Sequence, residues 1–291
     1  MMIKKMTLAA LAVGVLAVSC SSDDDSGTPQ EELADLRLDL NGLEPLGNGF
    51  TYEGWIIVDG NPVSTGVLTS ITFPQTMRVN ATQLSNATAF VLSIEPANDT
   101  DPAPSDTKVM AGDFAGNTAT VNTGVVGDFT SASGMFFLRT PTDEMGMNNG
   151  NDQYGVWFGT PGMPPTANFN LPTLPEGWAY EGWVVGDSGP LSTGTFTSFS
   201  AVDSSSLFSE TQQPGPPIPG EDFFINAPAG ETFPLDIRNR NVVISVEPVP
   251  DDSPAPFAMK PLVGIAGEET APATHPFGQN LASLPEGSVT R

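Results

Sequence analysis

The chain has 291 residues and carries 34 acidic against 10 basic side chains, a formal net charge of −24 at pH 7. A surface this negative repels nucleic acid and anionic lipid, so binding to either through a basic patch is excluded. The sequence also contains 30 glycines and 28 prolines. Because each interior proline costs a helix about 3 kcal/mol, long helices are disfavoured throughout the chain.

The N-terminus has the features of a secretory signal. Lys4 and Lys5 precede an apolar stretch, residues 8–18, that is too short to span a bilayer as a stable anchor. Small residues then lead into Cys20, the only cysteine of the chain, in the pattern of a lipobox. We predict that residues 1–19 form a signal peptide and that Cys20 receives a diacylglyceryl lipid. The alternative is an ordinary signal peptide with a chance cysteine at its cleavage site.

Residues 20–34 are rich in Ser, Asp, Gly, Pro and Glu and cannot bury enough apolar area to fold. We predict a flexible acidic tether between lipid and protein. Its Ser-Ser-Asp-Asp-Asp segment, residues 21–25, resembles the export signal of surface-exposed lipoproteins in Bacteroidetes-type bacteria, which implies an outer-membrane lipoprotein exposed at the cell surface. A solvated tether without an export role has the same composition.

Beyond the tether, short apolar runs rich in β-branched and aromatic residues are bounded by Gly, Pro, Asn and Asp, as at residues 55–58 and 89–94. They predict an all-β protein with two tandem antiparallel β-sandwich domains, residues 35–165 and 166–291. The boundary between the domains is placed at the Gly- and Pro-rich residues 159–165.

Two blocks of the sequence occur twice. Residues 52–70 recur at 180–198, and residues 90–108 recur at 242–260, in the same order. Self-similarity at this distance indicates two homologous domains. The second copy has more residues between its blocks, in a polar and Pro-rich insertion within residues 199–240. Because loops that distinguish otherwise equivalent domains often carry function, this insertion is a candidate site.

A shorter phrase, Asn-Leu-Pro-Thr-Leu-Pro-Glu-Gly at residues 170–177, recurs in altered form at residues 280–287. The second occurrence is either the remnant of a third copy or the last edge element of the second domain.

Four elements keep their order in both copies: Tyr-Glu-Gly-Trp, a turn with Pro and Ser-Thr-Gly, a strand that ends in Glu-Pro, and a Pro-Ala-Pro turn. In this order they resemble the extracytoplasmic C-terminal domain of anti-sigma-K factors, over residues 36–125 and 171–266. The resemblance implies a β-sandwich. Regulators of that family hold a sigma factor with a cytoplasmic helical domain and signal through a transmembrane helix. Since the sequence shows neither, we expect no direct sigma-factor binding.

Most of the repeated side chains have a structural interpretation. Glu95 and Lys108 recur together as Glu247 and Lys260, which predicts an ion pair in each copy. Carboxylates a domain apart cannot reach the separation of roughly 5–10 Å that glycoside hydrolysis needs. The repeated set comprises Tyr52, Glu53, Glu95 and Lys108 in the first copy, and Tyr180, Glu181, Glu247 and Lys260 in the second.

The tryptophans are candidate ligand-binding residues, because a row of exposed rings could form a carbohydrate platform. Such a platform would leave at least two rings open to solvent. Core packing is the favoured interpretation, since a buried Trp removes on the order of 200 Å² from water. The four tryptophans are Trp55, Trp157, Trp178 and Trp183.

Few residues indicate catalysis or metal binding. His275, the only histidine, lies in a Pro-rich segment that we expect to be a surface loop, without a nucleophile motif nearby. Zinc is excluded for want of His and Cys ligands. Asp143, Glu144 and Asp152 offer oxygen ligands for calcium, but their segment lacks the spacing of an EF-hand and is more typical of a hairpin turn. No other cofactor is expected.

We therefore expect a non-enzymatic, lipid-anchored envelope protein that acts by binding or as a structural module. Two alternatives remain: a glycan-binding surface protein and, less favoured, a hydrolase whose carboxylates lie between the two domains.

Overall fold

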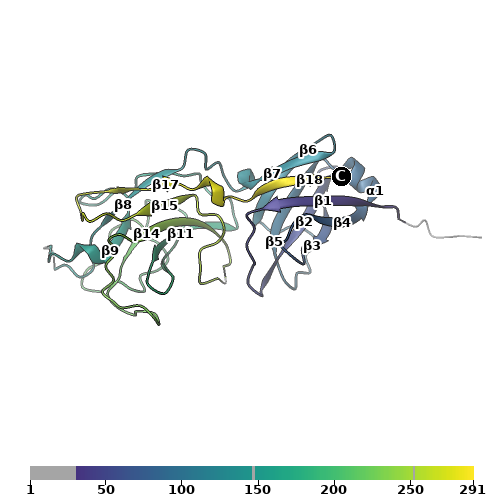
Figure 1. Ribbon diagram of the computed structural model, residues 1–291. Helices are drawn as coiled ribbons and strands as arrows, with labels where there is room; N and C mark the ends of the chain where they lie inside the picture. Colours follow the sequence, from purple (N-terminus) through teal and green to yellow (C-terminus); the bar gives the residue numbers. More distant parts are fainter. Residues whose placement is uncertain (1–30, 146–147, 252) are drawn as a thin grey trace, which may run out of the picture. The chain divides into compact units, whose positions relative to one another are not determined.

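The computed structural model describes residues 31–145, 148–251 and 253–291. The expected signal peptide, Cys20 and most of the expected tether lie outside the described residues. Strands make up the ordered structure, and the one α-helix of the described chain is α1 (Ala81–Asn86) (Figure 1). The all-β, antiparallel prediction is therefore confirmed. No helix among the described residues is long and apolar enough to cross a membrane.

The largest sheet has eight antiparallel strands in the order β3-β2-β5-β6-β7-β18-β1-β4. It is not one half of a flat sandwich but curls toward a closed barrel. Its two edge strands approach each other: a Cβ added to Gly66 in β3 would lie 3.2 Å from the Met77 methyl carbon in β4. The strands are β1 (Leu33–Asn41), β2 (Phe50–Val58), β3 (Asn61–Val67), β4 (Gln75–Asn80), β5 (Ala89–Pro96), β6 (Lys108–Ala115), β7 (Thr118–Asn122) and β18 (Glu286–Thr290).

Two five-stranded sheets hold the remaining strands. One has the order β12-β11-β14-β15-β17, and the other has the order β10-β8-β9-β13 with β16 paired to β8. The strands are β8 (Ser133–Leu138), β9 (Gly155–Phe158), β10 (Phe169–Asn170), β11 (Trp178–Val185), β12 (Pro190–Phe196), β13 (Gly220–Asp222), β14 (Asn241–Pro248), β15 (Leu262–Ile265), β16 (His275–Pro276) and β17 (Gly278–Gln279). Three 3₁₀ turns span Thr123–Val125, Asp152–Tyr154 and Leu281–Ser283.

The repeated sequence blocks form the same local structure. The order β3-β2-β5-β6 in the first sheet matches β12-β11-β14-β15 in another. In the β2–β3 hairpin the register shifts between Gly54 and Trp55, and in the β11–β12 hairpin it shifts between Gly182 and Trp183. Each shift leaves one extra residue on the second strand, which is a β-bulge.

The bulge accounts for the repeated Ser-Thr-Gly. Gly66 and Gly194 have φ angles of 106° and 109°, in the left-handed region that glycine adopts without strain. The extra residues, Thr65 and Thr193, are buried. A Cβ on Gly182 would lie only 2.4 Å from the Thr193 hydroxyl, so the repeated Tyr-Glu-Gly-Trp needs its glycine to admit the bulged threonine.

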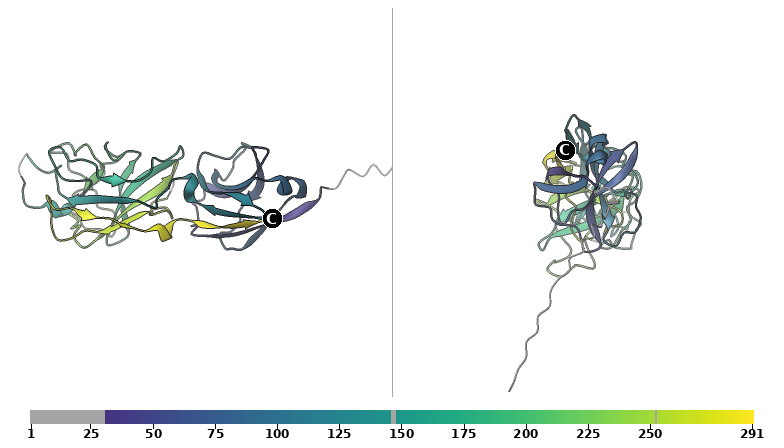
Figure 2. Two further views of the ribbon diagram at one scale, coloured as in Figure 1. Left: turned by 90° about the horizontal axis from the view of Figure 1, so that it is seen from above. Right: turned by 90° about the vertical axis from the view of Figure 1, so that its right-hand side faces the viewer.

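Strand pairing crosses the boundary placed at residues 159–165. β8 and β9 precede it, yet they pair with β16 and β13, which follow it. At the C-terminus, β18 lies between β1 and β7 in the first sheet, where Figure 2 shows its yellow strand beside purple β1. The recurring phrase at residues 280–287 thus leads into an interior strand of the first sheet, not an edge element of the second domain.

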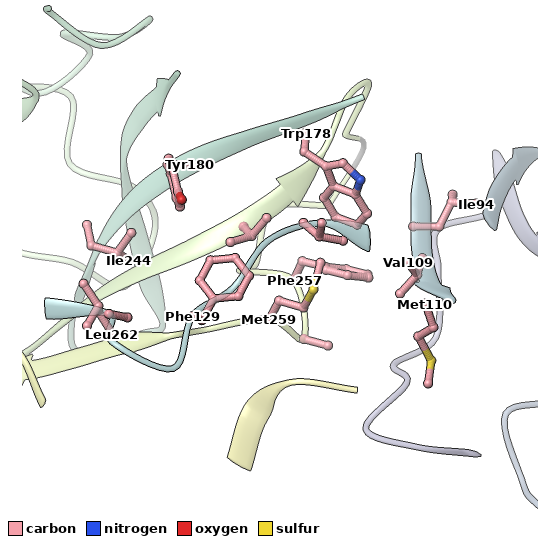
Figure 3. Close-up of a cluster of buried hydrophobic side chains, with 14 of the residues drawn as sticks. Ile94, Val109, Met110, Phe129, Trp178, Tyr180, Ile244, Phe257, Met259 and Leu262 are labelled. Atoms are coloured by element: carbon pink, nitrogen blue, oxygen red, sulfur yellow. The ribbon is translucent and has the colours of Figure 1, made fainter. Parts of the chain in front are cut away.

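The core joins aromatic and aliphatic side chains from these sheets. Ile94, Val109 and Met110 of the first sheet belong to the same buried cluster as Trp178 and Phe257 (Figure 3). Burial of side chains of this size contributes about 1.5–3 kcal/mol each, so this cluster is a main source of stability.

Candidate functional site

A hydrogen-bonded chain of Trp, Ser and Glu recurs in both copies. In the first copy the Trp55 indole N–H donates to Ser93 Oγ at 2.8 Å, and the Ser93 hydroxyl donates to Glu95. In the second copy the Trp183 indole donates to Ser245 Oγ at 2.7 Å, and the Ser245 hydroxyl donates to Glu247. Both glutamates are buried, with 1% of their surface exposed. The repeated tryptophans and glutamates therefore serve the same structural network.

Each buried glutamate also holds the Pro-Ala-Pro loop of its copy. The backbone N–H of Ser105 donates to both oxygens of Glu95, at 2.9 and 3.1 Å. The backbone N–H of Phe257 donates to both oxygens of Glu247, at 3.0 and 3.1 Å. A carboxylate that accepts backbone N–H groups satisfies donors that the loop would otherwise bury unpaired.

The predicted ion pair between these glutamates and the lysines is wrong. Lys108 Nζ donates to the backbone carbonyl of Ser105 at 2.9 Å, and Lys260 Nζ lies 3.5 Å from Glu44 Oε1. Backbone N–H groups and serine hydroxyls already occupy the carboxylates. A neutral donor set of this kind solvates a buried carboxylate without the cost of burying an ammonium group.

The other repeated side chains lie in matching positions. The Tyr52 hydroxyl donates to the carbonyl of Glu44 at 3.0 Å, and the Tyr180 hydroxyl donates to the carbonyl of Pro172 at 2.6 Å. Burial raises the pKa of both phenols. Glu53 and Glu181 each accept the hydroxyl of the serine before the bulge, Ser64 and Ser192.

None of the four candidate tryptophans is open to solvent. Trp55 and Trp183 are 2% exposed, and Trp157 and Trp178 are 3% exposed. An aromatic carbohydrate platform is therefore not formed by these rings. The four rings are instead part of the packed interior, in agreement with the core-packing interpretation of the sequence.

A carboxylate centre exists only in the second copy of the described chain. Oxygens of Glu181, Glu247 and Asp251 all lie within 4.8 Å of one another. Desolvation, followed by repulsion among these groups, raises the pKa of Glu247 to about 8 and that of Glu181 to about 7. Because negative charges this close repel one another, the cluster favours a state in which one of its carboxyl groups keeps a proton. Asp251 corresponds to Asp99 of the first copy, a repeated position that the sequence analysis did not consider.

The calcium candidates Asp143, Glu144 and Asp152 do not form a comparable cluster. Asp152 accepts the Thr140 N–H at 3.2 Å, and Glu144 pairs with Arg139 at 2.9 Å. Asp143 accepts amide groups from Asn149 and Asn151, at 2.9 and 2.7 Å. The carboxylates are thus directed to donors of their own loop, and no group of three acids from this loop meets within 4.8 Å in the described residues.

His275 is buried, not in a surface loop as expected. It lies in β16, paired with Phe136, and is 6% exposed. The Gly267 N–H donates to its Nδ1 at 3.2 Å, and its Nε2 donates to the Glu269 carbonyl at 2.9 Å. Both ring nitrogens are used by backbone groups, so the imidazole fixes a turn.

The insertion in the second copy lines a cavity of about 620 Å³, termed here the insertion pocket. Asp203, Ser206 and Gln213 contribute to it from the insertion, and Trp157 contributes from β9. Asp203 Oδ2 accepts the Gly220 N–H at 2.8 Å, which ties the start of the insertion to β13. The sequence analysis named this segment as a candidate site, and in the structure part of it lines a cavity.

Two buried acids of β13 lie behind the pocket wall. Ser209, which lines the pocket, donates its hydroxyl to Glu221, whose other carboxylate oxygen has no hydrogen-bond partner. Asp222 accepts the Thr142 N–H at 2.8 Å and the Trp157 indole N–H at 3.0 Å. The sequence analysis missed both acids, although an acidic pair before the apolar Phe-Phe dipeptide is an unusual pattern for a strand.

Burial changes the ionisation of the acids at and behind the pocket. Desolvation is the largest cause in each case, and it raises the pKa of Asp203, Glu221 and Asp222 to about 7. Hydrogen bonds from Gly220, Ser209 and Thr142 oppose this effect only in part. The pocket thus lies against carboxylates that water solvates poorly.

Comparison with known proteins gives one family match. The model of the anti-sigma-K factor RskA C-terminal family matches residues 28–108, which include strands β1 to β5. No curated protein and no solved structure matches the chain. The similarity therefore covers the first copy of the repeat and does not extend to the insertion pocket.

Proposed function

We propose that this chain is a non-enzymatic, lipid-anchored protein of the cell envelope whose insertion pocket binds a ligand. The observation that carries the proposal is the placement of the insertion. Residues 199–240 distinguish the second copy from the first, and part of this segment lines a cavity of about 620 Å³. A cavity of this volume lies in the range of small-molecule sites in proteins.

The chemistry of the conspicuous polar groups supports binding over catalysis. His275 is held by backbone groups at both ring nitrogens. Glu95 and Glu247 are buried and accept loop N–H groups. Groups engaged in this way hold the fold in place and are not presented to a substrate.

The anchor in this proposal is the lipid on Cys20, with residues 20–34 as the tether and the outer membrane as the location. The strongly acidic composition supports attachment through lipid, because such a surface does not adhere to anionic headgroups. The matched family is named for anti-sigma-K factors, but its matched part here is the C-terminal domain alone. We propose that this chain uses that domain type as a scaffold and does not contact a sigma factor directly.

A pocket-filling variant tests the binding proposal. Ser206 is exposed and lines the pocket, so Ser206→Trp would occupy the cavity. Ser200 is also exposed and belongs to the same segment, but it does not line the pocket, and Ser200→Trp is the matched control. Thermal shift would be measured against oligosaccharides, amines, amino acids and short peptides.

At least one ligand class should raise the melting temperature of the unmodified protein and of Ser200→Trp but not of Ser206→Trp, because binding stabilises the folded state by mass action. Equal shifts in all three proteins would place the binding elsewhere. Absence of any shift across the panel would contradict the proposal.

A further inference from the structure

We propose that the insertion pocket binds an organic cation, an ammonium or guanidinium group on a short aliphatic chain, with Asp203 and Glu210 as its counter-charges. This inference rests on the proposed binding function and names the ligand class. It predicts a preference for molecules such as diamines, agmatine, or the side chains of lysine and arginine.

The charges that line the pocket all have one sign. Asp203 and Glu210 both line it, and no Lys, Arg or His does. In the described part of the chain, the ion pairs engage Arg78, Arg139, Arg238, Arg240 and Lys260 with acids outside the pocket lining. Phosphates and carboxylates would be repelled, whereas a cation would supply the missing opposite charge.

The same lining is poorly suited to a metal ion. Calcium takes 6–8 oxygen ligands, with several carboxylates close together. Among the described residues, the acids that meet within 4.8 Å in a group of three are Glu181, Glu247 and Asp251, and none of them lines this pocket. The pocket lining offers two carboxylates, which is fewer than a calcium site usually has. An organic cation fits this lining better, because it brings its own N–H donors.

Apolar side chains complete the fit to an aliphatic chain. Trp157, Val202 and Ile218 line the pocket together with its carboxylates. An alkyl chain of a diamine or of arginine has apolar surface that these side chains would remove from water. The hydroxyl of Ser206 and the amide of Gln213 add acceptors for further N–H groups.

The acids at and behind the pocket wall have raised pKa values, chiefly because burial removes them from water. Desolvation raises the pKa of Asp203 to about 7. Desolvation and then repulsion by Asp203 raise the pKa of Glu221 to about 7. Asp222 and, beyond it, Asp143 extend the negative charge behind the pocket. A bound cation would lower the pKa of Asp203, so binding should release a proton from this carboxyl and should strengthen as pH rises from 6 to 8.

Isothermal titration calorimetry at low salt and pH 8 tests this inference with defined probes. The probes are 1,5-diaminopentane, agmatine, the matched neutral pentane-1,5-diol, calcium chloride and a neutral disaccharide. Asp203→Asn keeps an acceptor for the Gly220 N–H and removes the charge. Asp113→Asn, which removes an exposed carboxylate of β6 outside the pocket, is the matched control for net charge.

We expect one of the amine probes to bind. Asp203→Asn should weaken this binding about tenfold or more, because it replaces a charge-assisted hydrogen bond with a neutral one. Asp113→Asn should change the affinity less than about twofold, since Asp113 is exposed to water and does not line the pocket.

Three results with the amine, diol and calcium probes would overturn the inference. One is the absence of binding by both amines at millimolar concentration, and another is equal affinity for the diol. The third is calcium binding that Asp203→Asn abolishes, which would identify a metal site. A fourth result separates the two proposals. If the disaccharide binds, if Asp203→Asn leaves its affinity unchanged and if Ser206→Trp abolishes its binding, the cation inference is wrong but the proposed binding function of the pocket is supported.

Discussion

The Glu247 carboxylate accepts the backbone N–H of Phe257 with both of its oxygens, at 3.0 and 3.1 Å, while the Ser245 hydroxyl donates to the same group. This one buried side chain thus joins β14, the Pro-Ala-Pro loop and the Trp183 indole. Glu95 has the equivalent relationship with Ser105 in the first copy. Both copies therefore have a glutamate at this position because its carboxylate holds the Pro-Ala-Pro loop.

Glu247→Ala should lower the free energy of unfolding by about 1–3 kcal/mol, because it leaves the Phe257 N–H buried without an acceptor. Lys260→Met should cost less than about 1 kcal/mol, since its partner Glu44 is exposed. Urea denaturation of each variant checks this. A double variant of Glu247 and Lys260 should show additive losses of stability. A strong departure from additivity would indicate that the two side chains interact directly, in contrast to the structure.

Stability should fall as pH rises from about 4.5 to 8. The pKa values of five buried or partly buried acids are raised in the folded state, so the folded chain binds more protons than the unfolded chain over this interval. Each such group can lower stability by up to about 1.4 kcal/mol per pH unit where only the folded state retains its proton. The groups are Glu181, Asp203, Glu221 and Asp222, each at about 7, and Glu247, at about 8.

Melting temperature measured from pH 5 to pH 8 tests this dependence. Glu247→Gln removes one of the titrating groups and should flatten the curve. Asp128, Glu231 and Asp236 have lowered pKa values, so their stabilising effect is lost only in more acidic solution, below about pH 4.5. A melting temperature that rises between pH 5 and 8 would contradict the assigned directions.

Val289→Ala should destabilise the chain by about 1.5–3 kcal/mol, because a fully buried side chain is truncated. Val289 lies in β18 between Leu38 of β1 and Ala119 of β7. Ser288→Ala, at the adjacent and less buried position, is the control and should cost little. In the Val289→Ala variant, the amides of β1 and β7 should be the first to lose protection from hydrogen exchange. Equal effects of the two substitutions would argue against an interior position of β18.

Cys20→Ala should move the protein from the membrane fraction to the soluble fraction, because the proposed lipid is the sole attachment in our proposal. Ser21→Ala, next to the same cleavage site, should remain with the membrane. Fractionation of cells that produce each variant, followed by immunoblotting, measures the distribution. Sedimentation of Cys20→Ala with membranes would refute the lipid anchor.

The sequence by itself determined the all-β class, because short alternating apolar runs and frequent Gly and Pro are compatible with few other structures. It also located the repeated blocks and the insertion. These features depend on local order along the chain. The bulge at Thr65 and Thr193 was implicit in the repeated Ser-Thr-Gly, although only the register of the hairpins made it visible.

The tertiary structure decided which side chains meet. It directed Lys108 to a carbonyl and not to Glu95, buried His275 against Phe136, and brought Asp251 to Glu181. It also placed the C-terminal strand in the first sheet. Such contacts depend on pairing between residues far apart in sequence. No local sequence pattern specifies which of several apolar strands will pair with the unpaired edge strand of a sheet. The pocket arises in the same way, since residues of the insertion line it together with Trp157 of β9, the strand that pairs with β13.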